Sequence, residues 1–473
     1  MCSQYQYGKY LGITFARAPA VAKRLAAGDL LINCKICEKI RLVAFFLVVT
    51  AATRLFAAPP ELVQKPVPTL GLGKAIEQEF EKLTNFGITP FAAYYGVFQG
   101  NPVGGIQQRT AYSHLLLFGT TLNFEKLLGI PGASLLVSGA EPFGKNLSDD
   151  IGNINTVSEA FVTPLTVLFY ELYWKQTLFD GNLELRLGRM TAADQFASVP
   201  AFGLQVSGGI NGNPTSIFVN SPFTSSPNAT WAASAKIQIT KDVYAEAGIY
   251  QASERLGKTG YHGLNFAING ADGEFLTAQV GWEPTLFKLP ETTSFDKNGK
   301  KTVVDGTLEL PGNYILGGYY SNFKFPELNG SNTQTNAYGF YAMGQQMLWR
   351  SVADPHTNFS LWGGFTFSPQ QDISLLPFMG FAGTVWQGFI PRRDRDQLLL
   401  TYLVSSFSRD HGDAVVAMGG KRPTAEHVLE TSYAIYLTNN YTIQPDIQYI
   451  IRPNGTNEAK NSLVLGIQFI ANF

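Results

Sequence analysis

Cysteine and histidine, the residue types that most often bind metals or pair as nucleophile and base, are few and scattered here. The pair Cys34-x-x-Cys37 could form a redox or metal site, but it has neither a second pair nor a nearby histidine, and Cys2 is the one other cysteine. A lipase or protease would need a histidine beside its nucleophile. None of the five histidines stands in a Gly-x-Ser-x-Gly or similar setting: His114, His262, His356, His411 and His427. We therefore expect no enzyme, no cofactor and no metal.

Phosphate and nucleic-acid chemistry are also disfavoured. The stretch Gly71-x-Gly73-Lys74 is too short for a phosphate-binding loop and precedes no α/β pattern. The chain has 35 basic and 36 acidic residues, of which eight basic and two acidic residues precede residue 59. If that segment is removed, the remainder has a net charge of −7. Such a charge argues against a nucleic-acid partner.

The N-terminus has the layout of a secretory signal peptide. Lys39 and Arg41 precede the apolar run LVAFFLVVTAA (42–52), and small residues follow at Ala57 and Ala58. The run is too short to span a membrane as a helix, which needs about 20 apolar residues; a short N-terminal anchor is the alternative. We expect residues 1–58 to be an extension and signal peptide, with a start codon assigned too early, and 59–85 to be a short periplasmic segment containing a helix at 74–83. N-terminal sequencing of the precursor would test the start.

From residue 86 onward the sequence alternates apolar with polar or small residues in segments of about ten. This period of two places successive side chains on opposite faces of a sheet. Sixteen such segments begin near residues 86, 112, 131, 169, 182, 230, 242, 274, 312, 338, 357, 378, 397, 428, 441 and 461. A soluble β-sandwich would also alternate, so the number and linkage of the segments matter more than the pattern itself.

Two hairpins predict the register of neighbouring strands. A turn centred on Asp180-Gly181 pairs Leu178 with Leu183, Thr177 with Glu184, and Lys175 with Arg186. A turn at Lys241-Asp242 pairs Lys236 with Glu246 and Gln238 with Tyr244. In both hairpins one face is apolar and the other is polar. In the last hairpin, Pro445 is awkward within a strand, so a bulge or a local break is expected there.

The connections alternate between short turns (180–181, 240–241, 391–396 and 439–440) and long loops (139–168, 191–229, 251–273, 321–337 and 408–427). This alternation is typical of an antiparallel transmembrane β-barrel with periplasmic turns and extracellular loops. Lipid offers no hydrogen bonds, so a spanning sheet must close, and about 16 strands enclose an aqueous channel. The segment 285–311 is long where a short turn is due; it forms an extra hairpin, or the strand count is wrong there.

Several blocks resemble the carbohydrate-selective porin (OprB) family over roughly residues 70–473. The matching blocks are LTNFGITPFAAYYGVFQGNPVGG (83–105), YELYWKQTLFDGNLELRLGRMTAADQFA (170–197), LPGNYILGGYYS (310–321), GFYAMGQQMLWR (339–350), GFIPRRDRDQLLLTYLVSSFS (388–408) and LTNNYTIQPDIQYIIRPNG (437–455). The resemblance implies a sixteen-stranded barrel over 86–473 in the cell outer membrane, passing carbohydrates and other small solutes. It implies that Phe473 is read by the outer-membrane assembly machinery. The insert at 291–306 departs from the pattern of the family, which leaves the local topology there open. The resemblance also leaves open whether the protein forms a homotrimer.

Successive side chains of a strand alternate between the two faces of the sheet, and this alternation (strand parity) places a set of polar side chains in the lumen. The long loop 191–229 is predicted to fold into the lumen. The candidates for pore lining are Glu171, Tyr173, Lys175, Glu184, Arg186, Asp194, Lys236, Glu246, Gln444, Asp446 and Gln448. Each of them could instead be a solvated wall residue without selective effect. Lys175 opposite Arg186 is a repulsive pair; either Glu184 offsets it, or the cluster biases the pore toward anionic or hydroxylated solutes. The alternatives are a general or anion-preferring porin, and a binding or adhesion barrel that does not transport.

Overall fold

The computed structural model describes residues 73–288, 292–295, 301–304, 309–330, 332–351, 354 and 356–473. The predictions of an N-terminal extension, a signal peptide and its cleavage site lie outside these residues, and they stay predictions. Within the described part no helix is long and apolar enough to cross a membrane.

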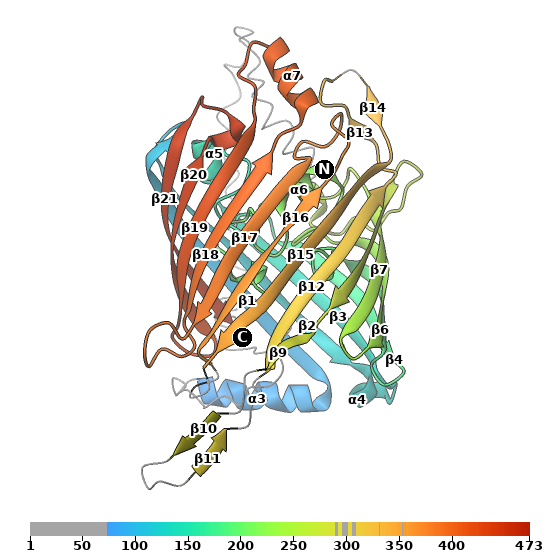
Figure 1. Ribbon diagram of the computed structural model, residues 1–473. Coiled ribbons are helices and arrows are strands. Elements are labelled where there is room, and N and C mark those ends of the chain that lie inside the picture. Colours follow the sequence, from blue (N-terminus) through green and yellow to red (C-terminus); the bar gives the residue numbers. More distant parts are fainter. Residues whose placement is uncertain are drawn as a thin grey trace, which may run out of the picture.

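Sixteen antiparallel strands close into one barrel, as the sequence predicts (Figure 1). Each strand pairs with its neighbours in chain order, and the last strand pairs with the first from Ala93↔Asn472 onward. The strands are β1 (Ile88–Gly105), β2 (Thr110–Asn123), β3 (Ala133–Gly144), β4 (Leu168–Leu178), β5 (Leu183–Met190), β6 (Thr230–Thr240), β7 (Val243–Ala252), β8 (Gly273–Trp282), β12 (Glu309–Ser321), β15 (Ala337–Arg350), β16 (Asn358–Phe367), β17 (Phe378–Gln387), β18 (Gln397–Ser406), β19 (Ala425–Tyr436), β20 (Tyr441–Ile451) and β21 (Lys460–Asn472).

The short helices and extra strands lie in the segments that precede or connect the sixteen barrel strands. Helix α3 (Gly73–Phe86) confirms the predicted N-terminal helix and lies at the end opposite α7 (Arg409–Ala417) in Figure 1. The irregular 285–311 segment contains β9 (Thr285–Lys288), which pairs with β12, and the predicted extra hairpin, β10 (Thr292–Phe295) with β11 (Lys301–Val304). The remaining elements are α4 (Phe124–Leu128), α5 (Ser148–Ile151), η1 (Phe202–Leu204), α6 (Thr215–Asn220), η2 (Thr259–Tyr261), β13 (Phe325–Pro326), β14 (Thr333–Gln334) and η3 (Pro453–Gly455).

The predicted registers of the two hairpins are confirmed. Leu178 pairs with Leu183 across the β4–β5 turn, where Asp180 and Gly181 both have positive φ (55° and 92°). A two-residue turn of this type needs positive φ at both central positions, which glycine adopts without a steric cost. Lys236 pairs with Glu246 in the β6–β7 hairpin.

Pro445 interrupts one strand pairing without creating a bulge. The β20–β21 ladder runs through Pro445↔Ile467 with no shift in register. The β19–β20 ladder keeps the same register but lacks two pairs between Ser432↔Asp446 and Ile435↔Ile443. The predicted local break is therefore confirmed, and the alternative of a bulge is wrong. Proline has no N–H to donate, so the missing bonds fall on the side where its nitrogen faces the neighbouring strand.

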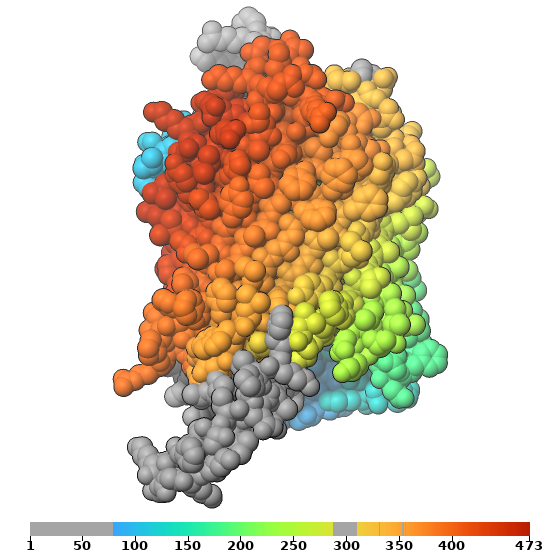
Figure 2. Space-filling model, viewed as in Figure 1, coloured from blue at the N-terminus to red at the C-terminus, as the bar shows by residue number. Residues whose placement is uncertain are grey.

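The outer face of the barrel is apolar. Large exposed side chains occupy alternate positions on most strands, for example Leu185 and Leu187 in β5, and Ile447 and Tyr449 in β20. In Figure 2 the side chains of β12 and β15–β19 form a continuous outer wall. Because a lysine or arginine at mid-depth on a lipid-facing wall costs about 2–4 kcal/mol, this face suits acyl chains.

Candidate functional site

Two loops fold into the barrel and contact its inner wall. The segment between β5 and β6, residues 191–229, contacts the wall on strands far around the barrel, which confirms its predicted insertion. The N–H of Ala201 donates to Oε1 of Gln345 in β15 at 2.8 Å, and the N–H of Val206 donates to Oε1 of Glu430 in β19 at 2.7 Å. Contacts on such distant strands require the loop to cross the lumen.

The inserted loop packs against a large apolar cluster on the inner wall. Phe202, fully buried in η1, meets Trp362 of β16 and Phe381 of β17 edge to face, with ring centroids 5.5 and 5.3 Å apart. Tyr319 and Tyr341 extend this cluster over β12 and β15. Alternation along the strands predicts polar inner faces, and this apolar lining was not predicted from it. Inward aromatic residues at alternate positions of β12–β17 were the signal that could have indicated it.

The segment between β3 and β4, residues 145–167, is a second inserted loop, whose insertion was not predicted from the sequence. Buried Glu426 of β19 accepts hydrogen bonds from the backbone N–H groups of Ile154 and Asn155, each at 2.9 Å. Buried Gln448 donates to the carbonyl oxygen of Val157 at 2.8 Å. The length of this loop was visible in the sequence, but its partners lie nearly 300 residues away along the chain.

Five of the predicted residues are buried on the wall beneath the loops: Glu171, Glu246, Gln444, Asp446 and Gln448. Nε2 of Gln444 donates to the carbonyl oxygen of Leu204 at 2.9 Å, and Glu246 accepts a 2.9 Å hydrogen bond from Gln195. The carboxylate of Asp446 accepts from Gln448 at 2.8 Å. Strand parity therefore assigns these side chains to the inner face correctly, and Gln444, Glu246 and Gln448 are hydrogen-bonded to the loops there.

Asp194, the candidate at the start of the long loop, lies near Glu171 of β4. Its Oδ2 atom accepts from the hydroxyl of Thr191 at 2.6 Å. The backbone N–H of Ala193 next to it donates to the carbonyl oxygen of Thr224 at 3.0 Å, so the two ends of the loop are clamped together.

The other five predicted residues form a polar patch that solvent still reaches, on β4, β5 and β6: Tyr173, Lys175, Glu184, Arg186 and Lys236. Glu184 lies between the two opposed cations, with its carboxylate 3.0 Å from Nζ of Lys175 and 2.6 Å from the guanidinium of Arg186. The predicted offset of the repulsive pair is confirmed. The side chain of Lys175 is 38% exposed, whereas that of Glu184 is 21% exposed.

Aromatic rings accompany these cations. The guanidinium of Arg186 lies 5.6 Å from the ring centre of Tyr173, and Nζ of Lys236 lies 3.8 Å from that of Tyr244. A flat ring beside hydrogen-bonding cations can stack on the face of a sugar while the cations bind its hydroxyl groups. The patch lies in the halves of the strands nearer the short turns, and Tyr173 also packs against the apolar cluster that includes the inserted loop.

Glu159 joins the two inserted loops. Its backbone N–H donates to the carbonyl oxygen of Val206 at 3.0 Å, and its side chain accepts from Nε2 of Gln468. Burial, with a smaller contribution from the neighbouring Glu430, raises the pKa of this loop carboxyl to about 8. The folded protein therefore binds this proton more tightly than the unfolded chain does. The resulting stabilisation is complete below the unfolded pKa of about 4.3 and is lost as pH rises through 8.

We expect the 145–167 loop to loosen above neutral pH. The pKa of Glu159 in the packed loop is about 8. Between pH 7 and pH 9 the equilibrium constant for local unfolding of the loop should therefore rise about tenfold, because one pKa unit corresponds to about 1.4 kcal/mol. Proteinase K cleavage within this loop, mapped by mass spectrometry, should accelerate by that factor after correction for the protease's own pH dependence. Glu159→Gln should abolish the excess, whereas Glu254→Gln, at an exposed position, should keep it. Equal pH dependence in wild type and Glu159→Gln would contradict the prediction.

Among the described residues, no group of three or more histidine, cysteine, aspartate or glutamate side chains could hold a metal ion. His262 contacts Thr166 at 2.9 Å, and His427 contacts Tyr402 at 2.8 Å. Neither pair lies beside an orienting carboxylate in these contacts.

Comparison with known proteins agrees with this geometry. The family described as "Carbohydrate-selective porin, OprB family" matches residues 107–473. Porin B of Pseudomonas aeruginosa is 25% identical over 411 residues, covering 79% of this chain and 85% of that protein. A putative porin, QuiX, of Acinetobacter baylyi is 22% identical over 330 residues, covering 63% of this chain and 67% of that protein. The solved structure of Pseudomonas putida OprB at high pH superposes with a TM-score of 0.74 at 23% identity, covering 83% of this chain and 96% of that one.

Proposed function

Because the chain belongs to the carbohydrate-selective porin (OprB) family, we propose that its solutes pass along the wall formed by β4, β5 and β6. The protein is an outer-membrane carbohydrate channel, and its family and fold indicate a channel rather than an enzyme. In such barrels the short turns face the periplasm and the long loops face the outside. The polar patch then lies in the periplasmic half of the lumen.

One observation carries this proposal. The inner residues of the β16–β20 wall are covered by the two loops, as Trp362, Glu430 and Gln448 are, whereas Lys175 and Arg186 keep solvent contact. Water and solutes move where side chains are accessible. We therefore assign pore lining to Tyr173, Lys175, Glu184, Arg186 and Lys236, and loop anchoring to the buried candidates.

Tyr173 is proposed to stack on the sugar ring during passage. Tyr173→Ala should lower the initial rate of sugar-driven liposome swelling about fivefold at low sugar concentration, because an aromatic face contributes about 1 kcal/mol to such contacts. Tyr173→Phe retains the ring and should restore the rate. Small-ion conductance should not fall in either variant. A sugar rate in Tyr173→Ala equal to that of the wild type would exclude the ring from the path, and a mono- to trisaccharide series would show which ring size is affected.

A preference for anions among charged solutes is a second candidate property. The accessible patch holds three cations, Lys175, Arg186 and Lys236, against one carboxylate, Glu184. This excess of positive charge favours a channel that attracts anions as well as hydroxylated solutes.

We further propose that Phe473 is the signal read by the assembly machinery. Its backbone pairs with Ala92 of β1 in both directions, at 2.8 and 3.1 Å, and its ring lies 5.5 Å from that of Tyr441. A terminal aromatic residue that closes the barrel is available to a receptor only before closure. Assembly into a homotrimer stays a prediction, which chemical cross-linking in outer-membrane vesicles would test.

A further inference from the structure

The loop between β7 and β8, residues 253–272, lies against the outside of the barrel. Arg189 in β5 is on the same face of the strand as Leu187, which is 66% exposed on the outer surface. Yet Arg189 itself is only 4% exposed. Its guanidinium donates to the carbonyl oxygens of Asn265 and Gly263 in this loop, at 3.0 and 3.1 Å. We call this loop the outer strap.

The outer strap is held in one position on the barrel wall. Nε1 of Trp231, the outward neighbour of Arg189 on β6, donates to the carbonyl oxygen of Phe266 at 2.9 Å. The Phe266 ring also contacts Phe169 of β4, with centroids 5.9 Å apart. At Gly263, where φ is +73°, a Cβ atom would lie 1.9 Å from the carbonyl oxygen of Phe169. No larger residue could follow the wall this closely.

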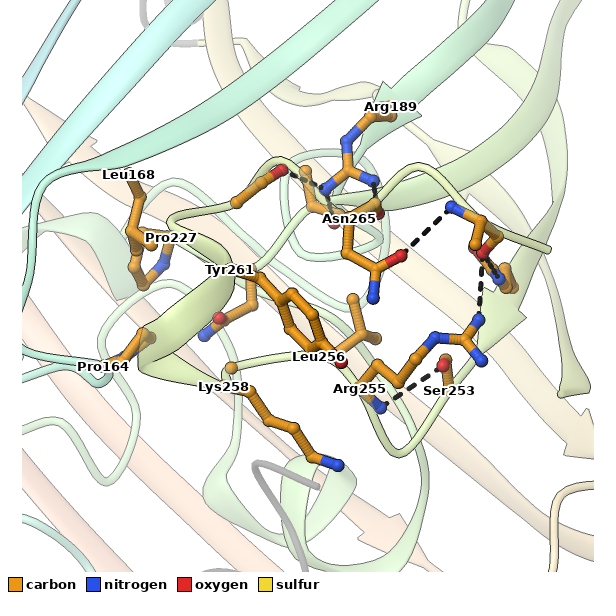
Figure 3. A pocket seen from close by; sticks show the side chains of 16 residues that line it. Pro164, Leu168, Arg189, Pro227, Ser253, Arg255, Leu256, Lys258, Tyr261 and Asn265 are labelled. Carbon is orange, nitrogen blue, oxygen red and sulfur yellow. Dashed lines mark hydrogen bonds between the residues drawn. The ribbon is translucent and has the colours of Figure 1, made fainter. Parts of the chain in front are cut away.

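A cationic cleft lies between the outer strap and the wall (Figure 3). The charged side chains that line it on the described residues are Arg189, Arg255 and Lys258, and none of the lining residues is an aspartate or glutamate. Arg255 is fixed by a 2.7 Å ion pair with Asp272. Nε of Arg189 and Nε of Arg255 are buried and have no hydrogen-bond partner in the described part of the chain.

The shape of the cleft indicates what could bind there. Its enclosed part measures about 30 Å³, enough for a water molecule or two. A larger group would have to bind at the open mouth, where Lys258 is exposed and the side chain of Arg255 is 18% exposed. Arg189, beneath them, contributes positive potential rather than contact. The donors at the mouth suit an anion with several oxygen atoms, because guanidinium groups bind phosphate through paired N–H donors.

Apolar side chains surround this cationic mouth. Leu264 is 58% exposed and Ile268 is 71% exposed on the same strap, and Tyr261 is 43% exposed in η2. Exposed leucine and isoleucine next to arginine and lysine are typical of surfaces at the membrane interface. The outer strap lies at the long-loop end of the wall, which is the level of the outer-leaflet headgroups. Water alone would leave these apolar side chains uncovered.

We propose that the outer strap binds an anionic lipid of the outer leaflet. Arg255 and Lys258 contact a headgroup phosphate at the mouth of the cleft, and Leu264 and Ile268 lie against its acyl chains. Arg189 holds the strap to the wall and adds positive potential from below. The cleft opens on the outside of the barrel, so this site is separate from the solute path and independent of which sugar is carried.

The test uses the full mature barrel, purified in detergent and titrated with lipid A, a phosphorylated glycolipid, by native mass spectrometry. Phosphatidylcholine and inorganic phosphate are the comparison ligands. Lys258→Gln should weaken lipid A binding about fivefold, because each basic residue near an anionic surface contributes about 1 kcal/mol. Adding Arg255→Gln should weaken it about fivefold more. Lys241→Gln removes the same charge from the short turn between β6 and β7, where this side chain is 89% exposed, and should bind like wild type.

Three results would overturn the proposal. The first is lipid A binding that is unchanged in Lys258→Gln, whose exposed side chain can be replaced without disturbing the strap. The second is equal affinity for phosphatidylcholine, which would reduce the site to a general apolar surface. The third is displacement of bound lipid A by millimolar inorganic phosphate, which would assign the cleft to a free anion. Sugar-driven swelling should be unchanged in these variants, so failure here is distinguishable from failure of the proposed solute path.

Discussion

Excising the inserted part of the β5–β6 loop should raise single-channel conductance about threefold, because a sixteen-stranded barrel encloses a wide aqueous channel once its filling is removed. The excision is geometrically simple. The N–H of Ala193 lies 3.0 Å from the carbonyl oxygen of Thr224, so residues 195–223 can be replaced by two glycines without moving β5 or β6. Discrimination between mono- and trisaccharides in liposome swelling should fall with the same change.

The excision exposes the apolar inner wall that the loop covers, and this exposure could itself change the conductance. Trp362 and Phe381 would face water, and a hydrophobic constriction can stop conduction by dewetting. A companion variant therefore adds Trp362→Ser and Phe381→Ser. Shortening the outer strap (253–272), which lies outside the wall, is the matched control and should leave conductance unchanged. Conductance at the wild-type level in both excision variants would show that the loop does not narrow the path.

Neutralising the polar patch should reverse the ion preference of the channel. Lys175→Gln, Arg186→Gln and Lys236→Gln together leave Glu184 without its ion-pair partners on the accessible wall. We expect the chloride-to-potassium permeability ratio to fall about tenfold, from above one to below one. A unit charge at about 4 Å is worth about 1 kcal/mol even in water, and three such charges are removed. Reversal potentials in planar bilayers under a salt gradient measure this ratio.

Ionic strength and two further variants sharpen this measurement. The change should be largest at or below 0.1 M salt, where the screening length is about 10 Å. Adding Glu184→Gln to the triple variant should bring the ratio back toward one. Lys241→Gln, at the exposed periplasmic turn, should behave like wild type. A triple variant with the wild-type ratio would remove these cations from the solute path.

The amino-acid sequence by itself determined the barrel and the direction in which its side chains point. Alternation at period two and the turn residues Asp180 and Gly181 are local, so the β4–β5 register followed from them without knowledge of the rest of the chain. The same parity placed Lys175 and Gln448 on the inner face correctly. Pro445 indicated the interrupted pairing because a missing N–H has its effect within one strand.

Only the tertiary structure decided which inner residues meet water. Lys175 and Gln448 both lie on the inner face of the barrel, yet Lys175 is accessible and Gln448 is fully buried beneath Val157. That difference depends on loops whose partners lie hundreds of residues away. Alternation along β5 places Arg189 on the outer face, where an arginine exposed to lipid would be destabilising. The tertiary structure shows that the outer strap covers this side chain. Periodicity reports the face of a strand, because it is set by neighbouring residues. Burial depends on what packs against that face, and here the packing comes from distant segments of the chain.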